Sequence, residues 1–263
     1  MTHLDENESL VEELFRQCFG FEIEKIPEGE ARTADFFVCD GDNSYLIELK
    51  TRYRSDVEIA QREAQFEASG LAELSRSIER RSGVSKLLSE AMAQIESSGA
   101  DVAALRLVFF LLRDFDADER WHNILTNLYG IKTVGDWSDD GKLRECYYFT
   151  DSDFFKYRDR LDAVIILIAA SGKSVLCLND HSEKIDVIRQ SRLRERFEDG
   201  VTDPPQSEAS GEIWLVDGQV DRSNEQAVIA FLQEKYSLSA LTMAIGMGYT
   251  SATVVVPEKG DPK

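Results

Sequence analysis

Apolar residues in the first half of the chain recur at either helical or strand spacing, and the two patterns alternate. Residues 8–19 and 84–97 each place their apolar side chains on one stripe, which predicts two amphipathic helices, the first ending at Gly20. Strands are predicted at 21–26, 34–39, 44–50 and 105–112. The expected order is therefore a helix, a three-strand meander, a second helix and a buried strand.

Weaker patterns continue the alternation in the second half. Helices are predicted at 121–128, at 151–158 with Asp151 as the cap, and at 224–236. Strands are predicted at 147–149, 163–169, 174–178 and 212–217. Pro204-Pro205 and Ser207 indicate a loop at 201–211, and Gly246-Met247-Gly248 indicates a turn or hinge.

This order of elements predicts an α/β fold. A helix between the strands 44–50 and 105–112 indicates a crossover onto a partly parallel sheet, so we expect a mixed β-sheet flanked by helices. Residues 1–180 are expected to form the core, and 181–263 a C-terminal α+β extension whose role the sequence does not indicate. Two insertions are expected in the core, at about 52–83 and 116–145.

The first insertion is unusually charged. Its residues 52–81 carry six acidic and six basic side chains. The pattern from 55 to 81 is helical but offers few bulky apolar groups for a core. We therefore expect a solvated helical segment that packs loosely.

Composition limits the location and the chemistry. No stretch approaches the roughly 18 uninterrupted apolar residues of a membrane helix, and the acidic N-terminus lacks the order of a secretion signal. A cytoplasmic protein without membrane association is expected. Three dispersed histidines offer little for a histidine-built site, and four scattered cysteines with apolar or aromatic neighbours predict buried thiols: Cys18, Cys39, Cys146 and Cys177. Any catalysis must rest on carboxylates and lysine.

One constellation offers such groups. Asp35 opens one predicted strand, Glu48-Leu49-Lys50 ends the next, and a tight turn joins the two. Because side chains alternate along a strand, Glu48 and Lys50 point to one face, where Asp35 can join them. Neighbouring carboxylates repel unless a cation lies between them, and Mg²⁺ (or Mn²⁺) prefers oxygen ligands. Lys50 could orient a metal-bound water and stabilise charge on a phosphate under attack.

These residues resemble the motif of the PD-(D/E)xK nucleases, with Ala34-Asp35 in place of the usual proline-aspartate and Glu48-Leu49-Lys50 as the second half. The resemblance covers about residues 8 to 112. It implies a restriction-endonuclease-like fold, Mg²⁺-dependent hydrolysis of phosphodiester bonds, more often in DNA than in RNA, and a backbone metal ligand from Leu49. It also implies an acid on the first helix, Glu13 or Glu12, and a lysine or glutamine on the helix 84–97, Lys86 or Gln94.

Alternative interpretations of the constellation stay open. Glu48 and Lys50 could form an exposed strand-end salt bridge, and the chain could be a non-catalytic module that binds nucleic acid or protein. The formal net charge of −19 weighs against a protein that coats nucleic acid by its overall field. It does not exclude a nuclease, because a metal site is itself acidic. A homodimer is allowed.

Two weaker patterns bear on nucleic-acid binding. Arg189, Arg192 and Arg196 share one face at helical spacing and could contact phosphates, although the acids around them favour an ion-paired, solvated face. The aromatic residues of 147–157 could stack on bases, but core packing is their more ordinary use.

Overall fold

The computed structural model describes residues 5–27, 29, 32–51, 64–65, 67–68, 71–77, 82–99, 104–113, 116–137, 141–243 and 249–255. No helix within these residues is long and apolar enough to cross a membrane. The predicted Gly246-Met247-Gly248 turn lies outside the described residues, as does most of the segment 52–70.

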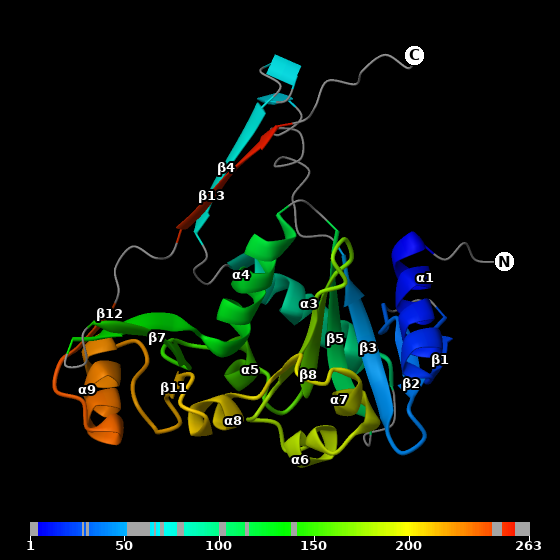
Figure 1. Cartoon of the computed structure of the whole chain (residues 1–263). Coiled ribbons are helices and arrows are strands. Elements are labelled where there is room, and N and C mark those ends of the chain that lie inside the picture. The colour runs from blue at the N-terminus through cyan, green and yellow to red at the C-terminus, as the bar shows by residue number, and fades with distance from the viewer. Residues whose placement is uncertain are drawn as a thin grey trace.

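A seven-stranded mixed sheet forms the centre of the molecule (Figure 1). In spatial order its strands are β1 (Glu22–Lys25), β2 (Phe36–Cys39), β3 (Ser44–Lys50), β5 (Leu105–Leu112), β8 (Ala163–Ile168), β9 (Ser174–Leu178) and β10 (Val201–Thr202). The first three strands form an antiparallel meander, and β5 and β8 then run parallel to β3. The predicted strands 44–50, 105–112 and 174–178 are confirmed at both ends.

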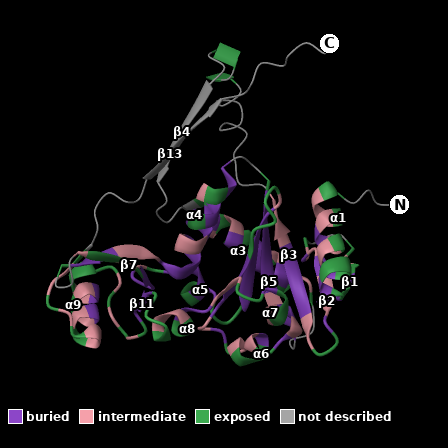
Figure 2. Ribbon diagram, viewed as in Figure 1, coloured by how far each residue is buried: buried purple, intermediate pink, exposed green. Residues whose placement is uncertain are grey.

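Helices cover both faces of this sheet, which confirms the α/β class. One face packs against α1 (Glu6–Glu13), its π-helical continuation η1 (Leu14–Phe19), α6 (Ile185–Arg189) and α7 (Arg192–Arg196). The other packs against α3 (Ser82–Ser97), α4 (Ala117–Tyr129) and α5 (Asp153–Lys156). Figure 2 shows the buried residues concentrated in the central strands between these layers. Because the helix α3 links the parallel strands β3 and β5, it is the crossover that the sequence predicts.

The second insertion and the C-terminal extension form a second sheet together. Its strands are β11 (Trp214–Leu215), β7 (Lys142–Tyr147), β6 (Lys132–Asp136) and β12 (Leu241–Met243). The helices α8 (Pro204–Ala209) and α9 (Glu225–Tyr236) belong to the same part of the chain. Trp214 and Val228 join the hydrophobic cluster that contains α3 and α4, so this sheet shares a core with the main one.

The expectation of a wholly helical first insertion is wrong. Residues 71–77 form β4, which pairs antiparallel with β13 (Tyr249–Val255) near the end of the chain. The local pattern could not show this, because strand formation here depends on the partner strand 249–255, far along the chain. Residues 64–65 and 67–68 are helical, as predicted.

Backbone amides of β4 should exchange with solvent faster than those of β5. The strands β4 and β13 form a two-stranded sheet, whereas β5 lies between two partners in the seven-stranded sheet. Two-stranded sheets are marginally stable in water, so they open more often. Hydrogen exchange followed by mass spectrometry measures this difference, and equally slow exchange in 71–77 and 105–112 would contradict it.

Three smaller expectations also need correction. Cys18 is exposed and Cys39 half-buried, whereas Cys146 and Cys177 are buried as predicted. The π-helical turn after Glu13 accounts for Cys18, because its wider spacing buries Phe15 and Phe19 instead. The predicted loop 201–211 contains β10 and α8, since Pro204 suits the first turn of a helix. The cap of α5 is Ser152, whose hydroxyl accepts a hydrogen bond from the Phe155 amide.

Candidate active site

The β2–β3 hairpin brings Asp35 close to Glu48. Phe36 lies opposite Ile47, and the amide of Asp35, the residue before β2, donates to the Ile47 carbonyl at 3.1 Å, so Asp35 lies beside the Ile47–Glu48 peptide. The two carboxyl groups are close enough for the charge of Asp35 to raise the pKa of Glu48. Asp35 Oδ2 also accepts a hydrogen bond from the Leu49 amide at 2.7 Å.

Lys50 joins this pair from the same strand and the same face. Its Nζ donates to Glu48 Oε1 at 2.7 Å and to Gln94 Oε1, on α3, at 2.7 Å. The Glu48 side chain is 2% exposed and that of Lys50 12%. The structure therefore brings together Asp35, Glu48 and Lys50 as the alternation predicts, and it adds Gln94 from the covering helix.

Burial makes the two carboxyl groups hard to ionise. Desolvation, and then the negative charge of Asp35, raise the pKa of Glu48 to about 8, although Lys50 acts in the opposite direction. Burial also raises the pKa of Asp35, against the hydrogen bond from Leu49 and the charge of Lys50. The single ammonium of Lys50 thus does not compensate both carboxyl groups, the buried Glu48 and the half-buried Asp35, and a further positive charge would stabilise the cluster.

The donor atoms fit a hard divalent cation. Glu48 Oε2 is buried and has no hydrogen-bond partner in the described part of the chain. The N–H and C=O of a strand residue point to the same side, so the Leu49 carbonyl, like its amide, faces Asp35, which lies just before the start of β2 and leaves this carbonyl without a strand partner there. The described residues contain no cluster of three or more acidic, histidine or cysteine side chains that could hold a metal. A site with two carboxylates therefore needs backbone oxygen and water, which is the ligand set that Mg²⁺ accepts.

The first helix contributes a different acid from the one predicted. Glu13 is exposed, and Glu12 pairs with Arg16 at 3.5 Å. The acid whose charge acts on Asp35 is Glu8, which also accepts from Lys25 Nζ at 2.7 Å. Glu8 belongs to a capping box with Asp5, and this local motif is the signal in the sequence that could have indicated its place in the first turn of the helix.

Of the two candidates on α3, only Gln94 reaches the cluster. The Lys86 side chain is 79% exposed and lies 3.9 Å from Glu90 on its own helix. One turn of helix places Glu90 next to Lys86, so this pair resembles an ordinary surface contact. The predicted site role of Lys86 therefore has no support from its position.

The arginine strip is not one helical face. Gln190 and Ser191 separate α6 from α7, and Arg189 binds both carboxylate oxygens of Asp203 at 2.9 and 2.8 Å. Arg192 donates to the carbonyl of Asp40, in the turn at the opposite end of β3 from Lys50. Arg196 is exposed near Phe21. The ion-paired interpretation is supported for Arg189, and the strip lies away from the carboxylate pair.

Core packing accounts for most of the aromatic run. Tyr147, Tyr148, Phe149, Phe154 and Tyr157 are all buried. Phe155 differs, because its side chain is exposed between Arg158 and Arg222. The run as a whole is therefore part of the core and not a stacking surface.

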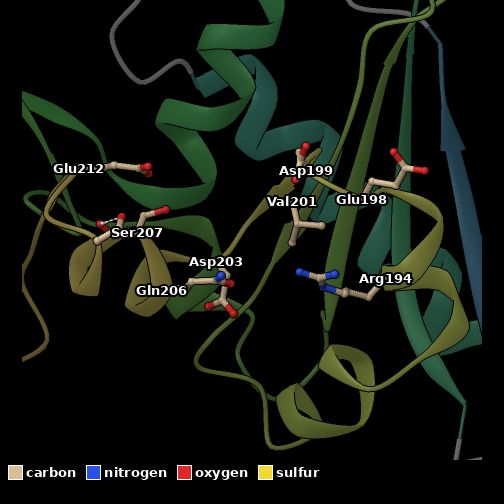
Figure 3. Close-up of a pocket in the computed structure, with 9 residues that line it drawn as sticks. Arg194, Glu198, Asp199, Val201, Asp203, Gln206, Ser207 and Glu212 are labelled. Atoms are coloured by element: carbon tan, nitrogen blue, oxygen red, sulfur yellow. Dashed lines mark hydrogen bonds between the residues drawn. The ribbon is translucent and has the colours of Figure 1, made fainter.

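A separate polar pocket of about 290 Å³ lies beside β10, at the other edge of the main sheet (Figure 3). Its walls include Arg194 on α7, Glu198 and Asp203 after that helix, and Gln206 and Ser207 on α8. None of the residues of the carboxylate cluster lines it. Small-molecule sites are mostly apolar, so this polar hollow does not compete with the cluster as the chemical centre.

Comparisons with known proteins leave the site to be interpreted from its geometry. No protein-family model, curated protein or solved structure matches this chain.

Proposed function

We propose that this protein is a divalent-metal-dependent nuclease that hydrolyses phosphodiester bonds, with Asp35, Glu48 and Lys50 as its active site. The observation that carries the proposal is the convergence of a buried carboxyl group (Glu48), a half-buried one (Asp35) and a lysine at the same end of two adjacent strands. Pairs of titratable groups with strongly shifted pKa values are typical of functional sites. A purely structural salt bridge would not need a second carboxyl group beside it.

The arrangement of elements supports a restriction-endonuclease-like fold for the core. A helix, an antiparallel meander, a crossover helix and a parallel strand follow one another as the resemblance to PD-(D/E)xK nucleases implies. The proposed metal ligands and the lysine lie just before the second strand and on the third, and Gln94 lies on the crossover helix. DNA is the proposed substrate, on the family resemblance alone.

Each residue has a chemical role in this proposal. Asp35, Glu48 and the Leu49 carbonyl would hold Mg²⁺ or Mn²⁺, which supplies Lewis acidity and an acidified water. Lys50, held between Glu48 and Gln94, would orient that water and stabilise the negative charge that develops on the phosphate. Gln94 Oε1 accepts from Lys50 Nζ, so it is a positioning residue for the ammonium.

Incubation of the purified protein with plasmid and with single-stranded DNA and RNA tests the proposal. Cleavage is expected with Mg²⁺ or Mn²⁺ and none with EDTA. Absence of metal-dependent cleavage on every substrate would favour the second candidate, a non-catalytic binding module. The observation behind that candidate is the Glu48–Lys50 ion pair at 2.7 Å, which can form without any metal.

A further inference from the structure

Cations other than Lys50 lie at the same end of the main sheet. The strands β3, β5 and β8 run parallel, and β9 runs antiparallel to β8. The C-terminal ends of β3 and β5 and the start of β9 therefore lie at the same end of the sheet. Lys50 ends β3, Arg113 follows β5, and Lys173 precedes β9. The strands that carry Lys50 and Arg113 are neighbours in the sheet, and the strand next to Lys173 is three positions from that of Lys50. Neighbouring strands lie about 5 Å apart.

The two outer cations also stand beyond the active site along the strand direction. Lys50 pairs with Phe110, so Arg113 lies three residues, or about 10 Å, further out. The Ile168 amide donates to the Lys173 carbonyl, and Ile168 pairs with Leu112, which places Lys173 at nearly the same height as Arg113. Arg113 meets Glu6 of α1 on one face of the sheet, and Lys173 meets Asp118 of α4 on the other. A nucleic-acid duplex that lies across this end of the sheet, with one phosphate at Lys50, would therefore meet both.

The present partners of these cations are easily displaced. Arg113 lies 3.4 Å from Glu6, which is 88% exposed, and Lys173 lies 3.4 Å from Asp118, which is 80% exposed. Ion pairs between exposed side chains contribute little to stability. Phosphate oxygens form stronger charge-assisted hydrogen bonds with guanidinium and ammonium groups. Lys173 Nζ is also held 4.4 Å from the centre of the Trp121 ring, which keeps it at this edge.

We propose that Arg113 and Lys173 bind backbone phosphates of the nucleic acid on one side of the scissile bond, in place of Glu6 and Asp118. This inference rests on the proposed function and names where its substrate lies. We call Arg113 and Lys173 the phosphate track. The chain carries a net charge of −19, which repels a polyanion, and these two local cations would attract it. Glu6 and Asp118 would act as competing anions when no substrate is bound.

Salt-dependent binding of a short fluorescein-labelled DNA duplex tests the track. The measurement is fluorescence anisotropy in the full-length Lys50→Ala background with EDTA, so no cleavage is required. Arg113→Gln and Lys173→Gln should each lower the slope of log K against log salt by about 0.9 and weaken binding several-fold at low salt. Glu6→Gln and Asp118→Asn should instead tighten binding, because each removes a competing anion, a result that a merely structural role would not give.

Arg196→Gln is the matched control, since Arg196 is an exposed arginine on α7, which contacts the opposite end of the sheet. It should leave the slope unchanged, and thermal melts should show all five variants folded. Unchanged slopes for Arg113→Gln and Lys173→Gln, an equal loss for Arg196→Gln, or no binding by any protein would overturn the track. Wild-type cleavage with unchanged slopes would refute the track alone. The expected slopes without wild-type cleavage would support the track and refute the nuclease.

Discussion

Lys50→Ala should reduce metal-dependent cleavage by roughly 10² to 10⁴-fold, while the protein still folds and binds metal. The ammonium acts on the attacking water and on the charge of the transition state, and it does not ligate the ion. Its removal also takes one positive charge away from Asp35 and Glu48, so Mn²⁺ binding should be equal or tighter. Cleavage rates and calorimetric Mn²⁺ titration of the same preparation separate the two effects.

Lys86→Ala is the matched control for this experiment, because Lys86 is a lysine on α3 whose side chain is exposed and makes no contact with the carboxylate cluster. Its cleavage rate should stay within about twofold of wild type. Unreduced metal-dependent cleavage by Lys50→Ala would place the active site elsewhere. A Lys50→Ala protein that does not fold would favour the structural salt bridge.

Without metal, the wild-type protein should become less stable between about pH 5 and pH 8 relative to Glu48→Gln. The pKa of Glu48 rises from an ordinary 4.5 to about 8 on folding, so between these values the folded state holds a proton that the unfolded state has lost. Its contribution to stability is complete below the unfolded pKa and is lost as the pH rises through the folded one. The raised pKa of Asp35 acts in the same direction.

Glutamine keeps the oxygen that accepts from Lys50 and removes the charge, so the difference between the two proteins isolates this carboxyl group. At pH 8 the variant should be more stable by about 3 to 5 kcal/mol, which corresponds to about 5 to 15 °C in Tm. At pH 5 the two should melt together. Mg²⁺ should stabilise the wild type at pH 8 and the variant much less. If the difference in Tm between the two proteins does not change from pH 5 to pH 8, Glu48 ionises normally. That result would contradict a site that lacks positive charge.

The centre of the site was predictable because its geometry is local. Asp40 Oδ1 accepts hydrogen bonds from the amides of Asp42 and Asn43 at 2.9 and 2.7 Å, which closes the turn between β2 and β3. That turn sets the register, and alternation then assigns Glu48 and Lys50 to one face. The turn residues and the alternation are both visible in the sequence, so placing Asp35 near Glu48 needed no knowledge of distant contacts.

Features that depend on distant contacts were missed. The strand β4 pairs with β13, and the second sheet combines β6 and β7 with β11 and β12, so neither the insertions nor the extension forms a separate unit. The helix acid was also misplaced, because only the packing of α1 against the sheet brings Glu8, and not Glu13, towards Asp35. Helical periodicity gives the faces of a helix but not which turn meets the site.

The position of a bound Mn²⁺ ion tests the central claim most directly. Crystals grown with Mn²⁺ should give an anomalous difference peak about 2.0 to 2.6 Å from a carboxylate oxygen of both Asp35 and Glu48, with Lys50 Nζ beside it. A strong Mn²⁺ peak elsewhere, with none between Asp35 and Glu48, would contradict the account.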